Sequence, residues 1–153
     1  ETVQVVFDPE VISPEQLAEI FWTEHDPATS AFSGQYRSIF FYEDEEQKAL
    51  AERTALETGA RLGVSIRTAI EPLENFYPAE QYHQKYYLQS RTELTGELKT
   101  LYPDLDTLLS SRTAARLNGY IAGQGTGDQF AEDLKNMELP APLAETARKM
   151  VRK

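Results

Sequence analysis

The N-terminal half of the chain contains three stretches whose hydrophobic pattern predicts β-strands. Val3, Val5 and Phe7 alternate with their neighbours, which is the period of a strand with one buried face. The unbroken apolar run at 39–42 predicts a buried central strand, and 65–72 predicts a third strand. Because helical patterns separate these stretches, the sequence favours a fold of mixed strands and helices.

Helix-start signals follow the first two predicted strands. Ser13-Pro14-Glu15-Gln16 combines a serine N-cap, a proline at the first helical position and a capping-box glutamine, so a helix is predicted to begin there. Asp44 and Gln47 form a second capping pair, which opens a helix predicted to end near Gly59.

The pattern becomes entirely helical after about residue 90. Prolines and a glycine-rich turn separate the predicted helices, which lie at 93–101, 104–117, 127–137 and 143–151. We therefore predict an α+β domain over residues 1–90 and a helical C-terminal extension over residues 91–153 that packs on the same domain.

Composition and charge exclude several classes of function. The 153 residues carry a net charge of −10, which argues against nucleic acid or an anionic membrane as the partner. No apolar run approaches the roughly 20 residues needed to span a bilayer, and we expect a cytoplasmic protein. The chain has no cysteine, which removes disulfides, thiolate nucleophiles and zinc–sulfur sites, and its two histidines argue against a histidine metal site.

The beginning of the chain is strand-like from its second residue and carries no methionine. We expect that an upstream part of the protein is absent from this chain.

The stretch FYPAEQYHQKYY, residues 76–87, concentrates aromatic rings, an imidazole and a carboxylate. Pro78 predicts a helix start, and the four-residue spacing of Tyr82 and Tyr86 would place both rings on one helix face. Such a stretch could belong to a core, a metal site or the wall of a pocket.

Four motifs, taken in order, resemble those of the peptide methionine sulfoxide reductase A family. They cover about residues 1–90 and read ETVQVVFDPEVIS, FWTEHDP, GQYRSIFFYEDEEQ and IEPLENFYPAEQYHQKYY. The helical tail, with LNGYIAGQGT, resembles the extension of one branch of that family more weakly. The resemblance implies an α+β two-layer sandwich similar to the ferredoxin-like plait, and it implies no metal or organic cofactor.

The chemistry of that family assigns expected roles to residues of this chain. A thiolate attacks the sulfoxide sulfur, a carboxylic acid supplies a proton, and tyrosine hydroxyls hold the sulfoxide oxygen. By resemblance, Glu1 stands where the family places its acid, and Tyr36 matches one oxygen-holding tyrosine. The expected rim of the substrate pocket consists of Tyr77, Glu80, Tyr82, His83 and Tyr86.

Four departures from the family pattern limit what this chain can do. The Gly-Cys-Phe-Trp motif with its nucleophile is missing, as is a second oxygen-holding tyrosine. The usual Gly-Asn-Asp has no counterpart in the loop before Gly34, and the tail carries no resolving cysteine. The chain as written should therefore not reduce a sulfoxide with thiols.

Each of these residues also has a simpler interpretation. Glu1 could be a solvated carboxylate at a chain end, and Tyr36 could be an edge-of-core tyrosine with one hydrogen bond. His83 could be a partly buried histidine that fixes a helix. Tyr82 and Tyr86 at helical spacing could serve packing alone.

The resemblance predicts a peptide-methionine (S)-S-oxide reductase that acts through a cysteine sulfenic acid. The expected partners are methionine sulfoxide, free or in proteins, and a thioredoxin-like or small-thiol reductant. We expect a monomer that repairs proteins under oxidative stress. The alternative is a non-catalytic relative that binds methionine or its sulfoxide, or an inert truncated product.

Overall fold

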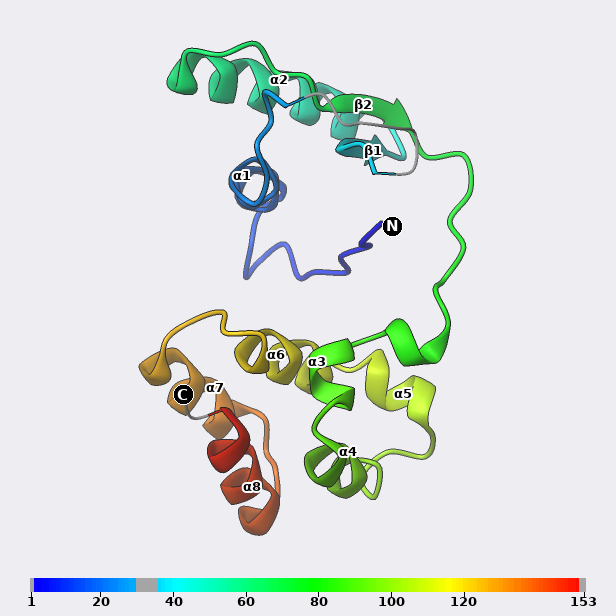
Figure 1. Cartoon of the computed structure of the whole chain (residues 1–153), viewed down its shortest axis with the longest axis vertical. Coiled ribbons are helices and arrows are strands. Elements are labelled where there is room, and N and C mark those ends of the chain that lie inside the picture. Colours follow the sequence, from blue (N-terminus) through cyan, green and yellow to red (C-terminus); the bar gives the residue numbers. More distant parts are fainter. Residues whose placement is uncertain (1, 30–35, 152–153) are drawn as a thin grey trace. The chain divides into compact units, whose positions relative to one another are not determined.

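Residues 2–29 and 36–151 are described by the computed structural model (Figure 1). The chain divides into two compact units, Glu1–Phe76 and Tyr77–Lys153. The sequence analysis placed the boundary between the α+β part and the helical part at residue 90. The division lies earlier because the helix that begins at Tyr86 packs on later helices. The packing of the helical part on the first part of the chain stays a prediction.

The first unit joins a parallel strand pair to two helices, as the upper part of Figure 1 shows. Its elements are α1 (Pro14–Thr23), β1 (Ile39–Tyr42), α2 (Glu45–Leu62) and β2 (Ala69–Pro72). Strands β1 and β2 run parallel, so α2 is the crossover that connects them. Their register pairs Ile39 with Ala69 and Phe41 with Glu71.

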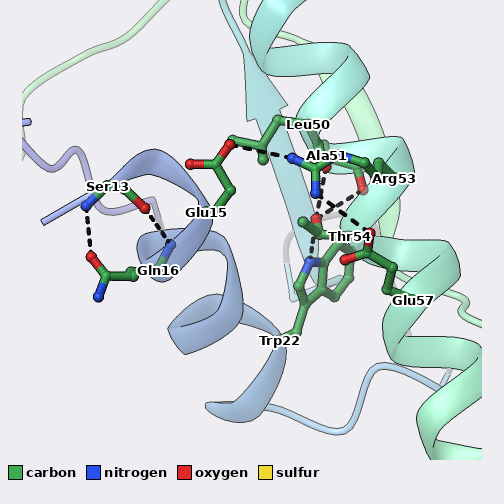
Figure 2. Close-up of polar contacts among 9 residues, drawn as sticks. All are labelled: Ser13, Glu15, Gln16, Trp22, Leu50, Ala51, Arg53, Thr54 and Glu57. Carbon is green, nitrogen blue, oxygen red and sulfur yellow. Dashed lines mark hydrogen bonds and ion pairs between the residues drawn. The ribbon is translucent and has the colours of Figure 1, made fainter.

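Both predicted helix starts of the first unit are confirmed. The Ser13 hydroxyl accepts a hydrogen bond from the Gln16 backbone N–H, and the Gln16 side chain accepts one from the Ser13 N–H (Figure 2). The Asp44 carboxylate accepts from the Gln47 N–H at 2.8 Å and begins α2. The predicted end of α2 at Gly59 is wrong. The helix continues to Leu62 because Gly63, with φ +68°, supplies the left-handed cap that favours glycine.

The strand predictions are confirmed only in part. Residues 2–8 form no strand, and the side chains of Val3 and Val6 are 86% and 94% exposed. A strand needs a hydrogen-bonded neighbour, and within the described ranges only β1 and β2 pair. For the same reason the predicted strand at 65–72 shortens to the four residues that face β1, and β1 is half-buried rather than a buried central strand.

The second unit is built from helices (lower part of Figure 1). They are the 3₁₀ turn η1 (Gln81–His83), α3 (Tyr86–Gln89), α4 (Thr92–Leu98), α5 (Leu105–Leu109), α6 (Arg112–Ile121), α7 (Gly127–Asn136) and α8 (Ala141–Val151). The single helix predicted at 104–117 is two helices, because Ser111 caps a new start with its hydroxyl on the Ala114 N–H.

Each unit has its own hydrophobic core. In the first unit, Trp22 and Ala18 of α1 pack with Ala55 of α2, and half-buried Phe40 and Ile70 bring in the two strands. In the second unit, buried leucines and alanines from six helices join Phe130. This core contains Leu88, Leu94, Leu98, Leu108, Ala114, Leu117, Phe130, Leu134, Leu143, Ala144 and Ala147. No helix in the described part of the chain has the length and apolar character needed to cross a membrane.

One buried hydrogen bond joins the two helices of the first unit. Trp22 is 2% exposed, and its indole N–H donates to the Thr54 hydroxyl at 2.9 Å (Figure 2). The same hydroxyl donates to the Leu50 carbonyl, one turn earlier in α2, at 2.8 Å. The hydroxyl of Thr54 therefore both donates and accepts, and it satisfies the only polar atom of a buried indole.

Replacing Thr54 by valine is expected to destabilise the first unit by about 1–3 kcal/mol, because the buried Trp22 N–H loses its acceptor. Thr54→Ser is the matched control, since it keeps the hydroxyl and loses one methyl group, at a cost of about 1 kcal/mol or less. Denaturant unfolding followed by the fluorescence of Trp22, the single tryptophan, measures both. Equal midpoints for the two variants would show that the hydrogen bond contributes nothing.

Candidate functional site

Tyr36 stands at the entrance to β1. Its side chain is 78% exposed, and its hydroxyl forms no hydrogen bond with another described residue. Such exposure is higher than an edge-of-core tyrosine would have, and it leaves the hydroxyl available to a ligand. The next residue, Arg37, pairs with Glu71 of β2 through two bonds of 2.7 Å each.

Hydrogen bonds of His25 and Pro27 in the motif FWTEHDP connect the end of α1 to the start of β2, and we call this connection the bracket. The His25 Nδ1–H donates to the Phe21 carbonyl and Nε2 accepts from the Thr68 hydroxyl, both at 2.8 Å. The carbonyl of Pro27 accepts from the Arg67 N–H at 2.7 Å. Because a carbonyl can only accept, this arrangement places the proton of neutral His25 on Nδ1. The bracket is structural and leaves His25 no free nitrogen for chemistry.

Asp26 caps a short turn inside this bracket. Its carboxylate accepts from the Thr29 hydroxyl and from the Ala28 N–H. These hydrogen bonds, that of Thr29 first, lower the pKa of Asp26 below its ordinary value. A carboxylate held in its charged form in this way stabilises a loop and cannot serve as a proton donor near neutral pH.

The rim residues expected between 77 and 86 lie in the second unit and are all exposed. The predicted helix over Tyr82 and Tyr86 is wrong, because the left-handed backbone of Lys85, with φ +48°, separates η1 from α3. The two tyrosines therefore do not share one helix face. The segment keeps its shape through Gln89, whose side-chain amide donates to the carbonyls of Gln81 and Gln84 at 2.6 Å.

Two of the rim residues, Glu80 and His83, approach each other. Their carboxylate and imidazole lie 3.8 Å apart, and the ring of Tyr82 lies 4.3 Å from that of His83 between centroids. The side chain of His83 is 54% exposed, which is more than a partly buried, helix-fixing histidine requires. Tyr77 is also largely exposed. Together these side chains form an accessible aromatic and polar surface.

Glu1 lies outside the described residues. Among residues 2–29 and 36–151, no three histidine, aspartate or glutamate side chains lie close enough together to hold a metal ion. Tyr36 belongs to the first unit and the rim residues to the second.

A polar cluster that the sequence analysis did not predict lies between α6 and α7. Asp133 accepts from the Arg116 guanidinium and from the Tyr120 hydroxyl, each at 2.7 Å. An open hollow of about 470 Å³ lies beside them, lined by Ala115, Arg116, Gly119, Tyr120, Gln124, Gly125, Gln129, Glu132 and Asp133. The sequence analysis noted only the glycine-rich turn that contains Gly125. In the structure its φ is +73°, and a Cβ there would lie 2.7 Å from the Tyr120 ring.

Comparisons with known proteins decide the family. A family model described as peptide methionine sulfoxide reductase matches residues 1–106. The chain belongs to the peptide methionine sulfoxide reductase family. The family resemblance predicted from the four motifs is confirmed, and all four lie inside the matched range.

Three relatives show how far the similarity extends. The peptide methionine sulfoxide reductase of Drosophila melanogaster is 43% identical over 141 residues, covering 91% of this chain and 56% of the relative. The enzyme named MsrA of Leptospira borgpetersenii serovar Hardjo-bovis is 47% identical over 92 residues, covering 57% of this chain and 52% of the relative. That of Methanosarcina acetivorans is 46% identical over 94 residues, covering 57% and 50%.

The coverage differs between the two parts of the chain. The chain spans about half the length of the curated relatives it matches. The family model ends at residue 106, whereas the match to the Drosophila protein covers 91% of the chain and so extends well into the helical unit. The helical unit is therefore shared with at least one member of the peptide methionine sulfoxide reductase family.

The Tyr120 cluster gives a pH dependence that can be measured. Burial, the hydrogen bond to Asp133 and the charge of Asp133 raise the pKa of Tyr120 to about 12. The folded state therefore favours the neutral phenol. This contribution to stability is fully present below the unfolded pKa of about 10 and is lost as the pH rises through about 12.

We expect the difference in absorbance titration between the native chain and Tyr120→Phe to show one tyrosine that ionises near pH 12. Asp133→Asn should lower the pKa of that tyrosine, because the negative charge beside the phenol is removed. A difference titration centred on the ordinary value of about 10 would contradict the placement of Tyr120 against Asp133.

Proposed function

We propose that the protein to which this chain contributes reduces the S-epimer of methionine sulfoxide, free or in proteins. Membership of the peptide methionine sulfoxide reductase family carries this proposal. The exposed hydroxyl of Tyr36, which forms no hydrogen bond with another described residue, supports it, because an accessible donor can hydrogen-bond a sulfoxide oxygen.

The proposed reaction reduces the sulfoxide and oxidises a cysteine of the enzyme. A cysteine thiolate attacks the sulfoxide sulfur and forms an S–S bond, while the oxygen takes up two protons and leaves as water as the S–O bond breaks. Water then hydrolyses the S–S bond, which releases methionine and a proton and leaves a cysteine sulfenic acid. Two external thiols then reduce the sulfenic acid, forming a disulfide between them and releasing water. These 153 residues contain no cysteine, so the nucleophile has to come from residues outside them.

Two residues of this chain have proposed roles in that reaction. Tyr36 donates a hydrogen bond to the sulfoxide oxygen and stabilises the negative charge that develops as the S–O bond breaks. Glu1 is the proposed proton donor, which requires a pKa raised by a site of low dielectric. The proposed rim consists of the exposed residues Tyr77, Glu80, Tyr82, His83 and Tyr86.

The finer predictions are proposals of the same kind. We propose a monomeric, cytoplasmic protein that repairs oxidised proteins and is recycled by a thioredoxin-like or small-thiol reductant. For the fold we propose an α+β sandwich similar to the ferredoxin-like plait with a helical extension. The parallel β1–α2–β2 crossover supports the mixed strand and helix character, and the all-helical second unit supports the helical extension.

The purified 153-residue chain is expected to show no dithiothreitol-dependent reduction of a methionine sulfoxide substrate, because it has no thiol. The positive control is the protein expressed from its complete coding sequence, assayed under the same conditions. Turnover by the chain alone would rule out a cysteine mechanism. If the complete protein binds the sulfoxide without turnover, the non-catalytic alternative holds.

In the complete protein, Tyr36→Phe is expected to lower kcat by about 100-fold, because one donor to the developing charge is lost. Tyr42→Phe, at the other end of β1, is the matched control and should leave kcat unchanged. The two variants are compared by steady-state kinetics, with circular dichroism to verify folding. Equal kcat values for both variants would remove Tyr36 from the oxygen-holding role.

A further inference from the structure

We propose that Arg37 and Glu71 form a clamp that positions Tyr36 for the sulfoxide oxygen. The inference rests on the proposed function, because positioning has a purpose only if Tyr36 donates to substrate. Arg37 and Glu71 are positioning residues: they act through the backbone of Tyr36 and do not touch the substrate.

The contact between the two side chains has the geometry of a strong pair. The Arg37 Nη1–H and Nη2–H each donate to a different oxygen of Glu71, and both distances are 2.7 Å. Such a two-pronged pair fixes the direction of both planar groups, which a single contact between exposed charges does not. The side chains are 43% and 35% exposed, so water still screens the pair in part. Its orientation is therefore more important than its strength.

The clamp acts at the N-terminal end of β1, where its pairing with β2 begins. The Ala69 N–H donates to the Ser38 carbonyl at 3.1 Å, and this bond lies just before the first register pair, Ile39 with Ala69. Glu71 lies further along β2, opposite Phe41. The side chain of Arg37 thus reaches from the entrance of β1 to a residue held inside the strand pair. The Arg37–Glu71 pair therefore attaches to β2 the residue that precedes Ser38, whose carbonyl already accepts a hydrogen bond from β2.

Tyr36 depends on this hold because little else in the described structure contacts its side chain. Its ring is 78% exposed, so packing does not determine where the hydroxyl lies. The direction of its Cα–Cβ bond follows from the backbone at residues 36 and 37. A donor that stabilises developing charge has to lie about 2.7–3.1 Å from the oxygen, and an error of about 1 Å can lower the rate 100-fold.

The same unit contains a matched control. Arg53 also pairs across elements, with Glu15 at 3.3 Å, and along its own helix with Glu57 at 3.4 Å. Figure 2 shows both contacts. Each is a single long contact between helical residues, and neither involves Tyr36 or strand β1, which follows it. Arg53→Gln therefore removes an ion pair of the same unit without altering the clamp.

The first measurement uses the 153-residue chain and needs no activity. Backbone ¹⁵N relaxation should give Tyr36 an order parameter near the value of about 0.85 that is typical of rigid backbone. Arg37→Gln and Glu71→Gln should lower it toward about 0.6 or below, and the charge swap Arg37→Glu with Glu71→Arg should restore it in part. Arg53→Gln should leave it unchanged. An unchanged value in Arg37→Gln overturns the clamp, whatever the protein catalyses.

The second measurement uses the protein expressed from its complete coding sequence. Arg37→Gln should lower kcat by about 10- to 100-fold with a smaller change in KM. The kcat of Arg37→Lys should lie between those of Arg37→Gln and the native protein. Lysine keeps the positive charge but lacks the planar guanidinium that makes two parallel hydrogen bonds. In a Tyr36→Phe background, Arg37→Gln should lower kcat by no more than about twofold. An undiminished loss there would overturn the inference, because a general loss of structure lowers activity in both backgrounds.

These two measurements separate the possible failures. If the complete protein has no turnover, the proposed function fails, and the order parameters still decide whether the clamp holds Tyr36. If turnover is present and Arg37→Gln has native kinetics, the clamp is overturned while the proposed function stands.

Discussion

The burial of Trp22 is the constraint on which the first unit depends. Its indole lies between α1 and α2, stacks on Phe40 of β1 at 6.2 Å between ring centroids, and uses its N–H on Thr54. Burying a tryptophan removes about 150–250 Å² from water, or about 4–6 kcal/mol at about 25 cal/mol per Å². A sheet of two short strands is marginal by itself. This side chain therefore ties the strand pair to both helices.

The position of Tyr36 follows from that arrangement. Trp22 and Phe40 place β1 against α1, and the bracket of His25 and Pro27 fixes the start of β2 beside it. The register then brings Glu71 within reach of Arg37. An exposed tyrosine is thus presented by a chain of contacts whose members lie far apart in the sequence. The rim residues of the second unit are arranged differently, by short-range glutamine hydrogen bonds around a left-handed Lys85.

The helical unit gives the family member a second, independently packed core. Its leucines come from helices of four to eleven residues, too short to be stable alone, so their burial against one another holds them. The pairing of Arg116 and Tyr120 with Asp133 joins α6 to α7 at the edge of that core. Similarity to the Drosophila relative extends into this unit, which makes it part of the shared architecture and not a random tail.

The sequence by itself determined the starts of α1 and α2 and the family. Capping residues act within one helical turn, so Ser13 and Asp44 begin helices where their sequence signals stand. Only the tertiary structure decided the strands and the contacts around Tyr36. A strand forms only where a partner supplies hydrogen bonds, which is why 39–42 became a strand and 2–8 did not. The acceptor of Trp22 and the partner of Arg37 lie 32 and 34 residues away, and no local pattern encodes such distant pairs.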